Sequence, residues 1–135
     1  MVPAKEIADR LRHALTGRGD VRVAVLFGSE ACGTAHAGSD VDVAVDAPEA
    51  DILELTAMLS EALSREVNVV SLEDATIPLL EQLVRDGIVV HEGYRGAGAL
   101  WRSRTLATLE TDRPWFARMR DAWLARVRER GLSRD

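Results

Sequence analysis

The sequence predicts a single α/β (α+β) domain, in which a small β-sheet is flanked by helices. Three observations lead to this fold class. At 135 residues the chain is long enough for one hydrophobic core but not for two. Its composition, 47% hydrophobic and 29% charged, is that of a globular protein rather than a disordered one. Short β-branched runs alternate with segments whose apolar residues recur at helical spacing.

The N-terminal half of the chain predicts a helix, two strands and a second helix. Residues 3–17 place apolar side chains on one helix face, and the segment GRGD that begins at Gly17 ends the helix. The runs VRVAVLF at residues 21–27 and VDVAV at residues 41–45 are short and β-branched, which favours buried strands. Residues 50–64 follow a proline and again carry leucines at helical spacing, so they predict the second helix.

The C-terminal half continues the alternation and then becomes helical. Residues 67–72 (VNVVSL) and residues 88–91 predict two further strands, and residues 77–85 between them predict a helix. Beyond the turn GYRGAGA, residues 99–110 and 114–130 carry arginines and apolar residues at helical spacing. These two segments predict two C-terminal helices.

The predicted domain covers residues 1–135, with a core at about 4–93 and a C-terminal helical segment at about 95–131. Residues 1–94 carry seven basic and 17 acidic residues, whereas residues 95–135 carry ten arginines and five acidic residues. This basic end is either a solvated helix face or a surface for an acidic partner. It also contains an apolar row that favours helix packing, or a partner interface if it extends past the core: Trp115, Met119, Trp123 and Val127.

Several function classes are disfavoured by the composition. No apolar run approaches the ~20 residues of a membrane span, and the N-terminus has no signal-type apolar core, so we expect a cytoplasmic protein with no membrane partner. Cys32 is the only cysteine, which excludes an intrachain disulfide and a cysteine-rich metal site. The acidic body has no evident template-binding region, so direct nucleic-acid binding is not expected.

Two aspartates interrupt the apolar strand that begins at residue 41. Because successive side chains of a strand point to opposite faces, Asp40 and Asp42 are expected to project together, while Val41 and Val43 share the other face. Two neighbouring carboxylates repel unless a cation balances them. Hard oxygen donors without histidine or cysteine favour Mg²⁺ or Mn²⁺ over Zn²⁺. Asp40 and Asp42 are therefore the predicted catalytic metal ligands.

A Gly-Ser pair follows the first predicted strand. Gly28 has no side chain, so a phosphate can approach its backbone, and the hydroxyl of Ser29 can donate a further hydrogen bond. Ser39 directly precedes the first aspartate. We therefore expect Gly28, Ser29 and Ser39 to bind a nucleotide triphosphate. No Walker-type lysine follows a glycine-rich loop, which argues against a P-loop NTPase.

The order Gly28-Ser29, ten residues, Asp40-x-Asp42 resembles the signature of the polymerase-β-like nucleotidyltransferase superfamily, and specifically of its minimal nucleotidyltransferase (MNT) antitoxins. The resemblance in element order covers about residue 4 to the C-terminus. It implies a mixed sheet, Mg²⁺ or Mn²⁺ at the aspartates, and transfer of AMP from ATP. It also implies a hetero-oligomer with a HEPN-family toxin ribonuclease, which some members adenylylate on a tyrosine and so silence.

The chain departs from the superfamily pattern at two positions. Asn68 stands where a third carboxylate is usual, and an amide brings no charge to a metal. Glu30 follows the Gly-Ser pair, where the family commonly has an arginine. Two other acids are weaker candidates to replace the missing carboxylate: Glu66, two residues before Asn68, and Asp46, at the end of the second strand. These departures predict weakened catalysis.

Two alternatives to an adenylylating antitoxin remain open. One is an antitoxin of the same fold whose catalysis is weakened and which inhibits the toxin by direct binding. The other is a small-molecule nucleotidyltransferase, similar to those that modify aminoglycosides. Such enzymes generally carry a further domain that shapes the acceptor pocket, and 135 residues leave little room for one.

Overall fold

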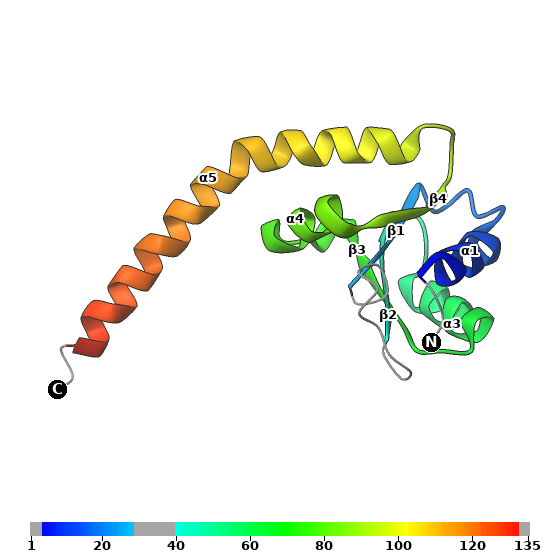
Figure 1. The fold of residues 1–135 in the computed structure, drawn as a ribbon, viewed down its shortest axis with the longest axis horizontal. Helices are drawn as coiled ribbons and strands as arrows, with labels where there is room; N and C mark the ends of the chain where they lie inside the picture. Colours follow the sequence, from blue (N-terminus) through cyan, green and yellow to red (C-terminus); the bar gives the residue numbers. More distant parts are fainter. Residues whose placement is uncertain (1–3, 29–39, 133–135) are drawn as a thin grey trace.

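The structure, a computed structural model, describes residues 4–28 and 40–132. Four strands form one mixed sheet in the order β3-β2-β1-β4, as Figure 1 shows. β1 pairs antiparallel with both β2 and β4, whereas β2 and β3 run parallel. The predicted fold class is confirmed, and the strands lie close to their predicted ranges: β1 (Val23–Phe27), β2 (Val41–Asp46), β3 (Val67–Ser71) and β4 (Ile88–Glu92).

Helices cover both faces of the sheet (Figure 1). α1 (Ala4–Leu15) and α3 (Ile52–Leu63) pack on one face, where Val41, Val43 and Val45 of β2 enter the larger hydrophobic core. α4 (Ile77–Asp86) and the start of α5 (Ala97–Leu132) pack on the other, against a smaller cluster that includes Ala44. Because strand residues alternate between faces, Asp42 belongs to the face that α4 and α5 cover.

The start of α3 is fixed by a side chain that the sequence supplies just before it. Asp51 has extended backbone geometry, and its carboxylate accepts hydrogen bonds from the backbone N–H groups of Leu53 at 2.9 Å and Glu54 at 3.3 Å. These bonds satisfy two of the donors that a helix N-terminus leaves free. α3 therefore begins at a defined residue and brings Glu54 to the loop after α1.

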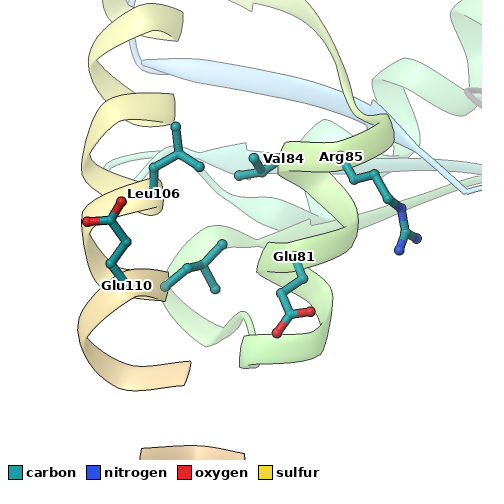
Figure 2. Close-up of a pocket in the computed structure, with 6 residues that line it drawn as sticks. Glu81, Val84, Arg85, Leu106 and Glu110 are labelled. Atoms are coloured by element: carbon teal, nitrogen blue, oxygen red, sulfur yellow. The ribbon is translucent and has the colours of Figure 1, made fainter. Parts of the chain in front are cut away.

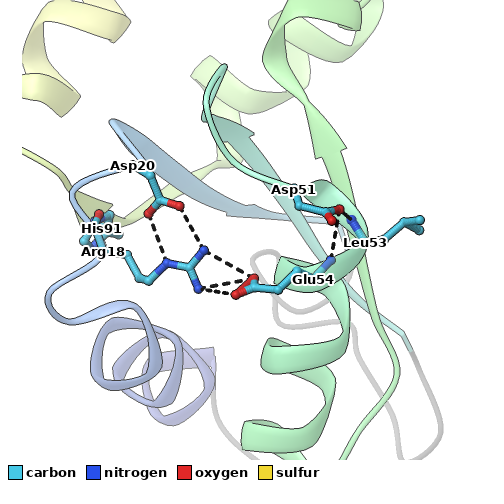
Figure 3. A network of polar contacts seen from close by, with 6 residues as sticks. All are labelled: Arg18, Asp20, Asp51, Leu53, Glu54 and His91. Atoms are coloured by element: carbon cyan, nitrogen blue, oxygen red, sulfur yellow. Dashed lines mark hydrogen bonds and ion pairs between the residues drawn. The ribbon is translucent and has the colours of Figure 1, made fainter.

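An arginine joins that loop to α3 (Figure 3). The guanidinium of Arg18 donates two hydrogen bonds of 3.0 Å to the carboxylate of Asp20 and one of 2.9 Å to Glu54. These interactions hold the pKa of the Arg18 guanidinium above its ordinary value and lower the pKa of Asp20. A ring nitrogen of His91 in β4 lies 3.0 Å from the Arg18 carbonyl oxygen. One arginine thus connects three elements beside the core.

The C-terminal segment differs from the prediction of two helices. Residues 99–110 and 114–130 lie within the single 36-residue helix α5, with Pro114 in its interior. Proline removes one helical hydrogen bond and crowds the preceding turn, so it bends a helix as readily as it ends one. Figure 1 shows α5 changing direction about halfway along its length. The prediction of two separate C-terminal helices was therefore wrong.

Where α5 leaves α4, the two helices enclose a cavity of about 330 Å³ (Figure 2). Its walls combine apolar and charged side chains from both helices: Glu81, Val84, Arg85, Leu106, Leu109 and Glu110. None of the predicted site residues lines it. Across the described residues, no helix combines the length and the apolar character needed to cross a membrane.

Candidate active site

The two predicted catalytic aspartates lie at the start of β2. Asp40 directly precedes the strand and its side chain is exposed, whereas Asp42 is the second strand residue and is partly buried. Asp42 pairs with Phe27 of antiparallel β1 on one side and with Asn68 of parallel β3 on the other. The central position of β2 in the sheet therefore brings the end of β1, both aspartates and Asn68 to one place.

Asn68 joins the two carboxylates. Its amide nitrogen donates a hydrogen bond of 3.2 Å to Asp40 Oδ2 and a longer one of 3.4 Å to Asp42 Oδ1. The side chain of Asn68 thus lies against both carboxylates. A neutral amide donor stabilises two neighbouring anions without cancelling their charge.

The environment of Asp42 disfavours its negative charge. Burial raises the pKa of the Asp42 carboxyl, and the charge of Asp40 adds to that rise, while the hydrogen bond from Asn68 lowers the pKa and partly offsets it. The pKa of Asp42 is raised overall, which means that the fold holds this carboxylate at a cost in free energy. Such a cost is typical of groups that are kept for binding or catalysis.

The turn after β1 requires a glycine for two reasons. Gly28 has a φ of +80°, which residues with a side chain rarely adopt. A Cβ atom added at Gly28 would also lie 2.6 Å from Asp42 Oδ2. The backbone of residue 28 therefore lies directly against the carboxylate of Asp42. The sequence identified Gly28 through the Gly-Ser pair but could not show this contact, because it depends on the register between β1 and β2.

Other residues considered from the sequence lie apart from this group or outside the described residues. Ser29, Ser39 and Glu30 fall in residues 29–39, so their predicted roles stay predictions. Glu66 precedes β3 with an exposed side chain, and its backbone carbonyl accepts a hydrogen bond of 3.0 Å from the Val41 N–H. Asp46 lies at the opposite end of β2, paired with Val23. Among the described side chains weighed as the third site residue, Asn68 is the one that hydrogen-bonds to the aspartates.

The donor set fits a hard divalent cation. Asp40 and Asp42 present carboxylate oxygens on one side of β2, and Asn68 carries an amide oxygen beside them. The raised pKa of Asp42 shows that its charge is incompletely balanced by these neighbours. Within residues 4–28 and 40–132, no group of three or more histidine, cysteine, aspartate and glutamate side chains is placed to hold a metal ion. A metal bound here would be held by the two carboxylates and the amide, and its other ligands would be water or the substrate.

Comparison with known proteins gives a curated protein adenylyltransferase and solved toxin–antitoxin structures. The curated protein adenylyltransferase MntA of Shewanella oneidensis strain MR-1 is 43% identical over 68 residues, which are 46% of this chain and 48% of the relative. The chain thus matches about half the length of this curated relative. A crystal structure of a toxin–antitoxin with AMP-PNP has a TM-score of 0.66 and 27% identity, covering 86% of this chain and 98% of that one.

A second solved structure shows the fold at lower identity. It is a complex of the tri-AMPylated Shewanella oneidensis HEPN toxin with its MNT antitoxin, with a TM-score of 0.57 and 24% identity over 89% of this chain and 95% of that one. The family model described as polymerase beta, nucleotidyltransferase matches residues 9–94. This match spans more than half of the chain and includes Gly28, Asp40, Asp42 and Asn68. The chain therefore belongs to the polymerase-β nucleotidyltransferase family.

Proposed function

We propose that the protein is an MNT-type antitoxin that works in the cytoplasm and transfers AMP from ATP to a HEPN-family toxin, which silences the toxin. The observation that carries this proposal is that Asn68 contacts both Asp40 and Asp42, while Asp42 lies against the backbone of Gly28. The likeness to protein adenylyltransferase MntA and to a toxin–antitoxin structure with AMP-PNP supports it. So does the AMPylated toxin in the solved complex.

The reaction is a displacement at phosphorus. A hydroxyl of the toxin, a tyrosine by the family resemblance, attacks the α-phosphorus of ATP and forms the new O–P bond. The bond from that phosphorus to the bridging oxygen breaks, and pyrophosphate leaves with the electron pair. Asp40 and Asp42 would hold Mg²⁺ or Mn²⁺, which neutralises phosphate charge and promotes loss of the hydroxyl proton when bound.

The protein's own groups position the nucleotide. Gly28 is proposed to bind the phosphates through its backbone, and its lack of a side chain leaves room for the carboxylate of Asp42 beside the turn. Ser29 and Ser39 are proposed to donate hydroxyl hydrogen bonds to the phosphate oxygens. Asn68 holds both carboxylates together through its amide nitrogen. Since Asn68 brings no negative charge, we propose that it binds the cation more weakly than a third carboxylate would.

The direct experiment uses the chain with the HEPN-family toxin proposed as its partner. The two purified proteins are mixed with ATP and Mg²⁺, and the intact mass of the toxin is followed. We expect mass increments of one AMP each, and Asp42→Asn should abolish them because it removes one of the two anionic ligands while keeping the side-chain shape. If the wild-type chain yields neither an AMP adduct nor a stable complex with that toxin, the proposal is wrong.

A second candidate is an antitoxin that inhibits by binding alone. Asn68 favours it, because this residue deprives the site of one charge that the superfamily usually supplies. The discriminating measurement is growth of cells that express the toxin together with either the wild-type chain or Asp42→Asn. Unchanged protection by Asp42→Asn supports inhibition by binding, whereas lost protection by a variant that still folds supports adenylylation.

A further inference from the structure

The second half of α5 extends beyond the rest of the protein. We call residues 111–132 the distal segment. α5 packs against α4, β4 and β1 through its first half, and Figure 1 shows the distal segment running away from the sheet. Its large apolar side chains are exposed, with Trp115 and Trp123 each at 57% and Met119 at 48%. Exposed tryptophan and methionine at this density are typical of an interface.

Four side chains of the distal segment are placed symmetrically about Met119, whereas exposed Val127, which continues the apolar row, has Thr111 as its counterpart. Trp115 and Trp123 lie four residues to either side of Met119, and Asp112 and Arg126 lie seven residues to either side. At 3.6 residues per turn, these five side chains fall within an arc of roughly 80° on one helix face. The same face therefore reads tryptophan, methionine, tryptophan in either direction, with an acid at one end and a base at the other.

Such a face is complementary to a second copy of itself. When two copies pair antiparallel about a twofold axis at Met119, each Trp115 meets the other copy's Trp123, and the two Met119 side chains meet on the axis. Asp112 of each copy then meets Arg126 of the other copy, which gives two such ion pairs in the dimer. A parallel arrangement would instead bring like charges together at both ends, so the charges select the antiparallel arrangement.

Three exposed arginines near Met119 are compatible with this arrangement. Arg118 and Arg120 lie on opposite flanks of the face, about 100° from Met119 in either direction, and both are exposed. Their guanidinium groups can stay in water while their aliphatic stems border the apolar row. Arg128 lies on the side of the helix opposite Met119.

We propose that the distal segment of α5 is a dimerisation surface whose occupant is a second copy of this chain, held antiparallel about Met119. Interfaces with this symmetry are closed, so the assembly stops at two copies. The proposal is independent of the transfer reaction, because none of the catalytic candidates lies in this segment.

The first test is the mass of the full chain by sedimentation equilibrium. We expect twice the chain mass of 14.8 kDa for the wild type. Met119→Arg should be monomeric, because it places two cations together on the twofold axis. Asp112→Arg alone and Arg126→Asp alone should each weaken dimerisation at least tenfold, and the double variant should restore it because both opposite-charge contacts are re-formed. Circular dichroism checks that each variant keeps its helix content.

A cross-linking experiment tests the register. In a Cys32→Ser background, Met119→Cys should be linked into a covalent dimer by a short bifunctional maleimide. Arg128→Cys is the matched control, since it lies in the same exposed helix on the opposite side, and it should stay unlinked. A monomeric wild-type chain, or a charge swap that fails to restore dimerisation, overturns the proposal. If the chain is monomeric alone and Met119→Arg prevents binding of the HEPN-family protein, the surface serves that partner instead, and the proposal is equally overturned.

Discussion

Asn68 lies directly opposite Asp42 on the neighbouring parallel strand, and its amide nitrogen donates a hydrogen bond of 3.4 Å to that carboxylate. The same nitrogen donates to Asp40 at 3.2 Å. In this arrangement Asn68 stabilises both carboxylates. Without a cation, the electrostatic repulsion in this site therefore costs less free energy than it would in a site of three carboxylates.

Replacing Asn68 tests this balance. Asn68→Asp adds a third charge and removes the amide donor, so we expect the metal-free protein to lose about 1–2 kcal/mol of stability. We also expect Mn²⁺ to raise the melting temperature of Asn68→Asp more than that of the wild type, because the added carboxylate strengthens binding to the folded state. Thermal unfolding with and without Mn²⁺ measures both effects.

Asn68→Ala is the control for the loss of the amide, since it removes the hydrogen bonds without adding charge. It should destabilise the protein slightly, and Mn²⁺ should raise its melting temperature no more than that of the wild type. If Mn²⁺ stabilises the wild type and Asn68→Asp equally, the charge at this position does not limit metal binding. Where the AMP-transfer assay gives an adduct, Asn68→Asp should also increase its rate.

The charge of Asp42 should cost stability in the absence of metal. The pKa of its carboxyl is raised in the folded state, so the folded protein binds this proton more readily than the unfolded chain does. The stability contributed by the protonated form is present below the ordinary aspartate pKa of about 3.9 and is lost as the pH rises through the higher folded value.

Asp42→Asn should therefore stabilise the metal-free protein at pH 7, by up to about 1 kcal/mol, because the side chain is partly exposed and solvent screens its charge. The gain should shrink as the pH falls through the range in which Asp42 is protonated. Urea unfolding at neutral and mildly acidic pH measures this difference. A variant less stable than the wild type at pH 7 would contradict the assignment of Asp42 as a strained carboxylate.

A side chain at residue 28 should destabilise the protein by more than the strain of a positive φ alone, because it also displaces the carboxylate of Asp42. Gly28→Ala forces a residue with a Cβ to a φ of +80° and places that atom 2.6 Å from Asp42 Oδ2. We expect a loss of about 2–3 kcal/mol and weakened binding of ATP with Mg²⁺, because the carboxylate must move.

The chain offers a matched control for this variant. Gly17 has a similar φ of +84°, but a Cβ added there meets no atom within 4 Å. Gly17→Ala should therefore cost only the backbone strain, about 1 kcal/mol, and leave nucleotide binding unchanged. Equal losses in the two variants, measured by chemical denaturation and by nucleotide titration, would show that the contact with Asp42 has no effect.

The order of the elements could be predicted from the sequence, because the β-branched runs and the helical rows are local patterns. Residues 77–85, for instance, became α4 with only one residue added at its end. What could not be predicted is relative placement. The contacts of Asn68 with Asp40 and Asp42 depend on the register of β3 beside parallel β2. The contact of Gly28 with Asp42 depends on the register between antiparallel β1 and β2. Residues 99–110 and 114–130 were predicted as two helices, whereas α5 continues through both.

The ion pair between Arg18 and Asp20 should make stability depend on pH in the sense opposite to Asp42. The hydrogen bonds from Arg18 lower the pKa of Asp20, so the contribution is fully present above the ordinary aspartate pKa of about 3.9 and is lost as the pH falls through the lower folded value. Asp20→Asn should therefore destabilise the protein at pH 7, and this destabilisation should disappear in acid.

Asp9→Asn is the control, because Asp9 pairs with Arg12 on the exposed surface of α1 and its replacement should change the stability little. Urea unfolding of the three proteins at several pH values measures the difference. An Asp20→Asn effect that does not vary with pH would rule out the ion pair of Arg18 and Asp20 as a source of pH-dependent stability.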